Sequence, residues 1–118
     1  TFAYCLLEKF GEEIGIGNTR PWDPIALQHG NSIDAMVLHR KEAWERAGGY
    51  ATDMPTMGWE DFDLWFRIAE VGGWGVQIPE ILARYRVRRN SMLHTITNPK
   101  ADKLWAYIRA KHPESFGI

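Results

Sequence analysis

The chain has 118 residues, of which 45% are hydrophobic and 25% are charged, and its formal net charge is −1. These values are ordinary for one globular domain and exclude a strongly basic nucleic-acid-binding chain. The single cysteine, Cys5, excludes an intrachain disulfide and a metal site built from several cysteines. No apolar run approaches the roughly 20 residues that cross a bilayer. Residue 1 is Thr rather than Met, so we expect the chain to be part of a longer protein.

The first half of the chain reads as short strands separated by loop sequence. Residues 2–7 predict a strand, and the glycines and isoleucines of 14–17 indicate a possible hairpin. Two prolines and two asparagines in 18–31 are typical of a loop. The apolar run in 32–39 predicts a buried strand that leads directly into a helix over 40–47, which a pair of glycines ends.

The second half of the chain interleaves helices with short strands. Apolar residues at helical spacing predict a helix over 59–71. A short strand over 74–78 is expected to end at a proline, and a second short strand is expected over 83–87. Asn98 followed by proline predicts the start of a last helix that ends before Pro113. The interleaving predicts an α/β fold, with residues 1–118 as a single domain.

The densest group of chemically active residues lies at the start of the helix predicted over 59–71. Its carboxylates are Glu60, Asp61 and Asp63. One interpretation is structural, because acidic residues favour the first helical turn, where backbone N–H groups are exposed. The other is catalytic: Asp61 would stay ionised and accept a proton from an attacking hydroxyl group. Trp59 and Trp65 would then offer flat ring faces to a sugar.

A basic run follows later in the chain. If residues 83–88 are extended, Arg84, Arg86 and Arg88 point to one face of the strand. Three guanidinium groups in a row suit a phosphate or a diphosphate. The alternative is an edge strand with a solvated basic face. His94 is the nearby histidine, and it is either a structural residue or a ligand.

Several short motifs in a fixed order carry a family resemblance. They are Gly48-Gly49-Tyr50, Gly58-Trp59-Glu60-Asp61-Phe62-Asp63-Leu64-Trp65-Phe66-Arg67, Gly72-Gly73-Trp74, Pro79-Glu80 and Tyr85-Arg86. The series resembles the C-terminal half of a family 2 glycosyltransferase with the GT-A fold. The run 31–36 followed by Arg40, and the pair Ser91-Met92, extend the resemblance over roughly residues 20–97.

The resemblance implies an inverting sugar transfer from a nucleotide-sugar donor to a glycan or another hydroxyl acceptor, with a divalent metal ion such as Mg²⁺ or Mn²⁺. In such enzymes the aspartate of the Glu-Asp motif is the general base, and this position is Asp61. Glu60 would hold the acceptor or orient Asp61. Gly58 and Trp59 would form the floor of the acceptor site, with Trp65 beside them.

The sequence departs from the family pattern in two ways. It has no Asp-x-Asp motif in a donor context, so the donor-binding half is expected to lie outside this chain. Many relatives carry a histidine two residues after the Tyr-Arg pair, where this chain has Arg88. The resemblance therefore implies that Arg86 and Arg88 bind the diphosphate, and that either Arg88 replaces the metal's charge or His94 supplies the metal ligand.

Three further expectations follow from the family. The parent fold is a mostly parallel sheet flanked by helices, so half of it would expose strand edges and apolar surface and would associate with itself. The isolated fragment is expected to be inactive. The protein is expected in the cytoplasm, either free or at the inner face of a membrane, with no nucleic-acid partner. The alternative function is a non-catalytic sugar-binding or phosphate-binding assembly module on the same scaffold.

Overall fold

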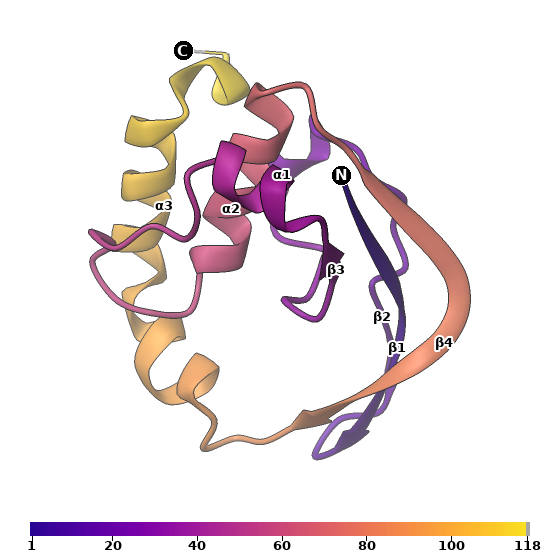
Figure 1. The fold of residues 1–118 in the computed structure, drawn as a ribbon. Helices are drawn as coiled ribbons and strands as arrows, with labels where there is room; N and C mark the ends of the chain where they lie inside the picture. Colours follow the sequence, from indigo (N-terminus) through magenta and orange to yellow (C-terminus); the bar gives the residue numbers. More distant parts are fainter. Residues whose placement is uncertain (118) are drawn as a thin grey trace.

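β1 (Phe2–Gly11) lies inside a four-stranded sheet in the computed structural model, which describes residues 1–117. It pairs antiparallel with β2 (Gly15–Gly17) and with β3 (Leu38–His39). On its other side it pairs in parallel with β4 (Gly75–Val87). The hairpin of β1 and β2 is therefore confirmed, and the domain has a mixed sheet of the α/β class (Figure 1).

The strand predicted over 32–39 is wrong for most of its length, since only the two residues of β3 pair with the sheet. The preceding backbone instead forms turns closed by side chains. The N–H groups of Ile33 and Met36 donate to Asn31 Oδ1 and Asp34 Oδ1, at 3.1 and 2.9 Å. Because these donors are already used by local side chains, the segment loops out and does not extend as a strand.

The two strands predicted on either side of Pro79 are one continuous strand, β4. The pairing with β1 runs from Cys5 opposite Ile78 to Leu6 opposite Ile81, so Pro79 lies in an irregularity of the register. A proline there removes no ladder hydrogen bond, because the bulge already leaves that position unpaired. Among residues 1–117, β4 pairs with β1 alone, so its other edge is free.

The three main helices are α1 (Lys41–Arg46), α2 (Glu60–Glu70) and α3 (Ala101–Lys111), which confirms the helices predicted there. Short helical turns are η1 (Ala26–His29), η2 (Leu93–Thr97), η3 (Asn98–Lys100) and η4 (Pro113–Phe116). The predicted start at Asn98 is wrong, because the chain is already helical from Leu93 and Asn98 has helical dihedral angles. No helix in the described chain is both long and apolar enough to cross a membrane.

All three main helices lie on one side of the sheet (Figure 1). α2 supplies the centre of the core: the ring of Trp65 stacks on Phe2 of β1 with centroids 4.6 Å apart. Its indole N–H donates to the carbonyl of Ile33 at 3.3 Å. The buried core also contains Tyr4, Leu27, Phe62, Leu64, Phe66, Ile68 and Ile108. The other face of the sheet has no helix of residues 1–117 against it.

Candidate active site

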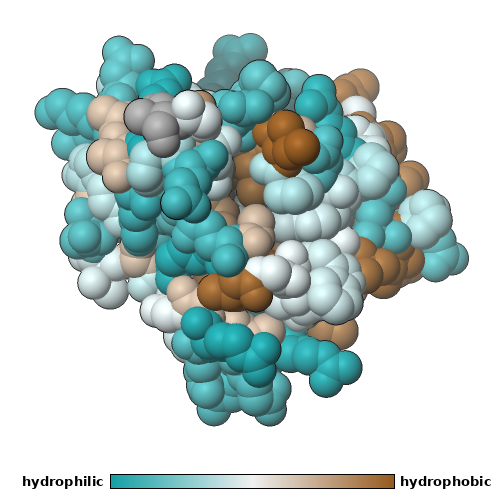
Figure 2. All heavy atoms as spheres, turned by 90° about the horizontal axis from the view of Figure 1, so that it is seen from above, coloured by the Kyte–Doolittle hydropathy of each residue, from teal (hydrophilic) through white to brown (hydrophobic). Residues whose placement is uncertain are grey.

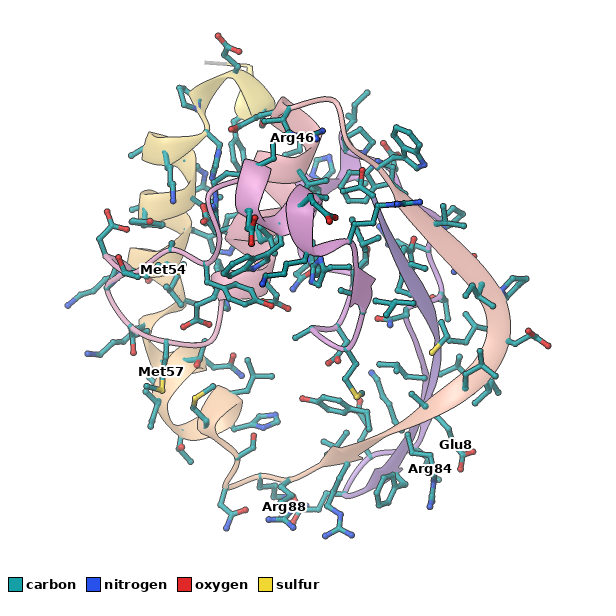
Figure 3. The ribbon with its side chains drawn as sticks, in the orientation of Figure 1. Glu8, Arg46, Met54, Met57, Arg84 and Arg88 are labelled. Carbon is teal, nitrogen blue, oxygen red and sulfur yellow. The ribbon has the colours of Figure 1, made fainter. Side chains whose placement is uncertain are left out.

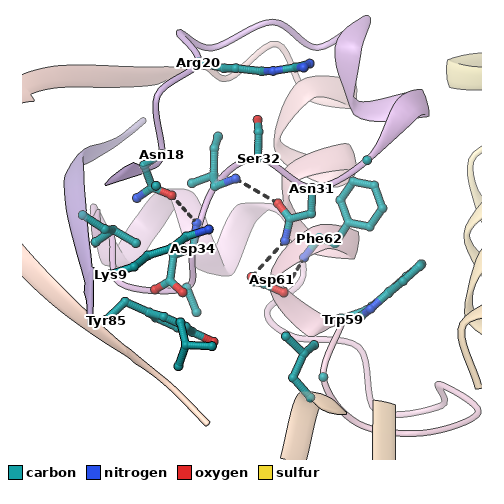
Figure 4. A pocket seen from close by; sticks show the side chains of 18 of the residues that line it. Lys9, Asn18, Arg20, Asn31, Ser32, Asp34, Trp59, Asp61, Phe62 and Tyr85 are labelled. Carbon is teal, nitrogen blue, oxygen red and sulfur yellow. Dashed lines mark hydrogen bonds between the residues drawn. The ribbon is translucent and has the colours of Figure 1, made fainter. Parts of the chain in front are cut away.

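A cavity of about 1020 Å³ lies between the inner face of the sheet and the start of α2. We call it the central cavity. Lys9 of β1 and Tyr85 of β4 line it from the sheet, and the loop before β3 contributes residues 30–35. The opposite wall is made by residues 58–62 and by 92–94, of which Leu93 and His94 begin η2. The cavity therefore gathers these five segments from across the chain (Figure 4).

Asp61 lies in the first turn of α2 and faces the central cavity. Its Oδ1 accepts the N–H of Phe62 at 2.8 Å, and its Oδ2 accepts Asn31 Nδ2 at 3.2 Å (Figure 4). Burial raises the pKa of Asp61 from 3.8 to about 6; the two hydrogen bonds oppose this rise and the charge of Asp34 adds to it. At pH 7 most of this carboxyl is ionised. Its pKa is close enough to neutral pH that the carboxylate can still accept a proton.

Glu60 also borders the cavity, but its carboxylate is engaged by the backbone. Both of its oxygens accept the N–H of Gly58, at 3.1 and 2.9 Å, which closes the turn before α2. Gly58 has a φ of +118°, and a Cβ there would lie 2.2 Å from Thr97 Oγ1. Glycine is needed because η2 comes this close to the loop. These contacts give Glu60 a structural role in the turn before α2; they test neither of the two roles expected for it, holding the acceptor and orienting Asp61.

Asp63, the third acid of the run, points away from the cavity into the interior, where none of it is exposed. Its Oδ2 accepts Arg67 Nε at 2.9 Å and Lys111 Nζ at 3.1 Å, and its Oδ1 lies 2.7 Å from His112 Nε2. Burial alone would raise the pKa of Asp63, but the bonds from His112 and Lys111 and the charge of Arg67 lower it. Asp63 is therefore a structural residue that ties α2 to α3.

Of the two tryptophans predicted to contact a sugar, one lines the cavity and the other is buried in the core. Trp59 lines the cavity and packs edge-to-face against Trp105, with centroids 5.2 Å apart. Trp65 is completely buried, so the acceptor contact predicted for it is wrong. The reason is helical geometry: six residues after Trp59, Trp65 has turned toward the sheet and stacks on Phe2.

The arginines of β4 lie on the outer face of the sheet. Arg84 and Arg86 sit over the ring of Phe10, at 4.2 and 5.2 Å from its centroid, while Tyr85 between them lines the cavity. Arg88 follows the end of β4, away from the helices (Figure 3). The described lining of the cavity includes neither Arg86 nor Arg88. The structure therefore does not bring the two predicted diphosphate ligands together with Asp61.

His94, the predicted metal ligand, does line the cavity, and its Nδ1 lies 2.9 Å from Ser91 Oγ. Within residues 1–117, no three side chains of His, Cys, Asp or Glu gather to hold a metal ion. His94 thus has no second and third ligand in this part of the chain. The residues present do not fit the divalent metal site that the resemblance implies.

Three polar residues of the cavity were not predicted to be site residues: Asn31, Asp34 and Tyr85. All three lie in motifs that carry the family resemblance. They line the cavity with Asp61; burial raises the pKa of Tyr85, and the charges of Asp34 and Asp61 raise it further. Asp34 is held by Asn18 Oδ1, which accepts its backbone N–H at 2.8 Å. The sequence signal that could have pointed to Asn31 and Asp34 is that two polar side chains lie close together at the start of the run 31–36.

Comparison with known proteins does not identify the chain. No family model matches it, and neither a curated protein nor a solved structure gives a significant match. The function is therefore argued from the geometry of the central cavity.

Proposed function

We propose that this chain forms the acceptor-binding and catalytic-base half of an inverting glycosyltransferase with the GT-A fold. The observation that supports the proposal best is the placement of Asp61. It is a carboxylate on a rigid helix, partly withdrawn from water, and it faces a cavity large enough for a saccharide. The motif that carries the family resemblance is the one that supplies this residue.

In the proposed reaction, the acceptor hydroxyl lies against Asp61 and gives its proton to the carboxylate. The oxygen forms a bond to the anomeric carbon as the bond from that carbon to the nucleoside diphosphate breaks, so the configuration inverts. The proton remains on Asp61. A pKa of about 6 suits this step, because the group is mostly ionised at neutral pH and still basic enough to take the proton.

The wall beside Asp61 would bind the acceptor. Trp59 and Trp105 line the cavity next to it and offer apolar ring surface to the C–H face of a sugar. Asp34 and Tyr85 supply polar groups on the opposite side. Gly58 and Glu60 shape the loop that carries Trp59 and do not need to touch the sugar themselves.

The donor half of the site is proposed to come from elsewhere in a longer protein. Arg86 lies on the outer face of β4 and Arg88 follows the end of that strand, and neither lines the cavity, so the nucleotide diphosphate would need other groups to hold it. The other ligands of the divalent metal would likewise come from outside this chain, and His94, the predicted metal ligand, lines the cavity. On this proposal the isolated chain binds an acceptor but does not transfer a sugar.

A non-catalytic sugar-binding module is the second candidate. The aromatic wall of the cavity favours it. A phosphate-binding module is less supported, because Arg84 lies 3.9 Å from Glu8, which partly neutralises the basic face (Figure 3). A sugar-binding module needs the aromatic wall but not the base.

The test uses the longest natural protein that contains this chain. Transfer from a panel of nucleotide-sugars is measured with Mg²⁺ or Mn²⁺, for the natural protein and for Asp61→Asn. We expect transfer to fall by about 10²–10⁴-fold, the usual contribution of a general base. Asp102→Asn, on the exposed side of α3, is the matched control and should be unchanged. Equal transfer by Asp61→Asn and the natural protein would reject Asp61 as the base.

A further inference from the structure

Asn31 connects the loop before β3 to Asp61 through a side chain whose orientation is fixed at both ends. Its Oδ1 accepts the N–H of Ile33 at 3.1 Å, and its Nδ2 donates to Asp61 Oδ2 at 3.2 Å (Figure 4). A flipped amide would turn its oxygen toward a carboxylate and its NH₂ toward a backbone N–H. Both contacts would then be repulsive, so only one orientation is stable.

The second oxygen of Asp61 is held independently. Its Oδ1 accepts the N–H of Phe62 at 2.8 Å. With one donor on each oxygen, the carboxylate cannot rotate about its last bond without breaking both contacts. Each oxygen keeps a free lone pair, and these are available to a group in the central cavity.

We propose that Asn31 is a positioning residue for Asp61: its amide fixes the carboxylate in the central cavity and stabilises the ionised form that accepts a proton. Only the statement that Asp61 accepts a proton in the reaction rests on the proposed function. The positioning itself concerns two side chains that contact each other in the free protein.

The other charged and titratable groups around the cavity set the background for this effect. They are Lys9, Glu13, Arg20, Asp34, Tyr50, Glu60, Tyr85 and His94. Lys9 Nζ lies 3.9 Å from Glu13 Oε2, so the negative charge of Glu13 partly offsets the effect of the Lys9 charge on Asp61. Asp34 opposes Asn31, because its negative charge raises the pKa of Asp61 whereas the bond from Asn31 lowers it. The two neighbours therefore predict shifts of opposite sign when each is replaced.

Three variants separate these contributions. In Asn31→Ser the hydroxyl oxygen can still accept the N–H of Ile33, so the turn survives. The serine side chain is too short to reach Asp61, so one hydrogen bond to the carboxylate is lost. Asp34→Asn removes a like charge and keeps the side-chain oxygen that Met36 uses. Ser32→Ala, in the same loop and on the same cavity wall, is the matched control.

The experiment follows the carboxyl ¹³C resonance of Asp61 by NMR as pH is varied, with Asp61→Asn used to assign the signal. We expect the titration midpoint to rise by about 0.5–1 pH unit in Asn31→Ser, to fall in Asp34→Asn, and to stay unchanged in Ser32→Ala. An unchanged midpoint in folded Asn31→Ser would overturn the proposal. Asn31→Gln, which keeps an amide but displaces it, should give an intermediate shift if Asn31→Ser does not fold.

A parallel measurement separates this inference from the proposed function. The acid limb of the pH profile for sugar transfer is recorded in the longer protein carrying Asn31→Ser. If Asp61 is the base, the limb moves toward higher pH by the same amount as the NMR midpoint. A midpoint that moves while the limb does not would leave the positioning role intact and reject Asp61 as the base.

Discussion

His112 Nε2 lies 2.7 Å from Asp63 Oδ1 in the interior, joining the end of α3 to the first turns of α2. Asp63 therefore stabilises the packing of α2 against α3, although it is only two residues from Asp61. Three carboxylates that look equivalent in the sequence thus have separate tasks. Glu60 closes the turn at Gly58, Asp61 faces the cavity and Asp63 anchors a helix.

Replacing Asp63 should destabilise the protein strongly. Asp63→Ala would leave Arg67, Lys111 and His112 without their shared partner, and breaking a buried ion pair typically costs about 3–5 kcal/mol. Urea unfolding at pH 7, followed by circular dichroism, measures this loss. Asp102→Asn on the exposed side of α3 should stay within about 0.5 kcal/mol of the natural protein. A similar small effect in Asp63→Ala would show that the buried cluster contributes little.

The stability of the protein should also depend on Asp63 at acid pH. Its pKa is lowered below 3.8 in the folded protein, so its stabilising contribution is present above pH 3.8 and is lost as the pH falls through the folded value. Unfolding free energies measured between pH 5 and pH 2 should therefore fall steeply in the natural protein. In Asp63→Asn the slope over the same range should be shallower.

Asp61 should have the opposite linkage. Its pKa is raised from 3.8 to about 6, so the folded state binds the proton more tightly and loses stability as the pH rises through that interval. Asp61→Asn should then be more stable than the natural protein by about 1–3 kcal/mol at pH 7.5. The difference should shrink as the pH falls and vanish at about pH 3, below both pKa values, where Asp61 is mostly protonated in the folded and the unfolded state. Urea unfolding at the two pH values tests this, and a variant less stable at pH 7.5 would contradict it.

The sequence predicted those parts of the fold whose signals are local. Glycine pairs marked the ends of two helices, and the hairpin at β2 followed from Gly15 and Gly17. The failures came from partners distant in the chain. Pro79 looked like a strand end, but the bulge opposite Cys5 and Leu6 removes its cost.

The candidate site was predicted only in part, for the same reason. Asp61 could be recognised because it lies within a motif, but Asn31 lies 30 residues away in a loop that read as irregular. Trp65 looked like a sugar contact because it shares an aromatic run with Trp59. Trp65 is on the face of α2 that meets the sheet, where it stacks on Phe2 from near the N-terminus.

Gly58 should tolerate no side chain. In Gly58→Ala the new Cβ would lie 2.2 Å from Thr97 Oγ1 and 2.6 Å from its Cγ2, so the loop must move away from η2. Gly72→Ala is a matched control, since Gly72 also has a positive φ but has nothing within 4 Å of the added atom. We expect a cost of about 1 kcal/mol for Gly72→Ala and at least twice that for Gly58→Ala, measured by thermal unfolding. Equal costs would mean that the contact with Thr97 relaxes freely.

The outer face and free edge of β4 should promote self-association. Val76, Ile81 and Leu82 are 50%, 50% and 63% exposed, on a thirteen-residue strand whose outer edge is unpaired within the described chain. Seen from above, hydrophobic side chains gather along the right-hand side of the molecule in Figure 2, which is the side of β4 in Figure 1. Long apolar edge strands pair with other chains unless charges or bulges prevent it.

Sedimentation velocity over a range of concentrations measures this association. We expect the natural chain to form dimers or larger species as its concentration rises, and Leu82→Lys to shift the equilibrium toward monomer, because a charge on an edge strand opposes sheet pairing. Ile25→Lys is the matched control: Ile25 is 72% exposed but lies in the loop before η1, so the same change there should leave the association unaltered. If the natural chain is monomeric at every concentration, the face of β4 is not a self-association surface. If both lysine variants dissociate the protein equally, net charge rather than the strand edge controls its association.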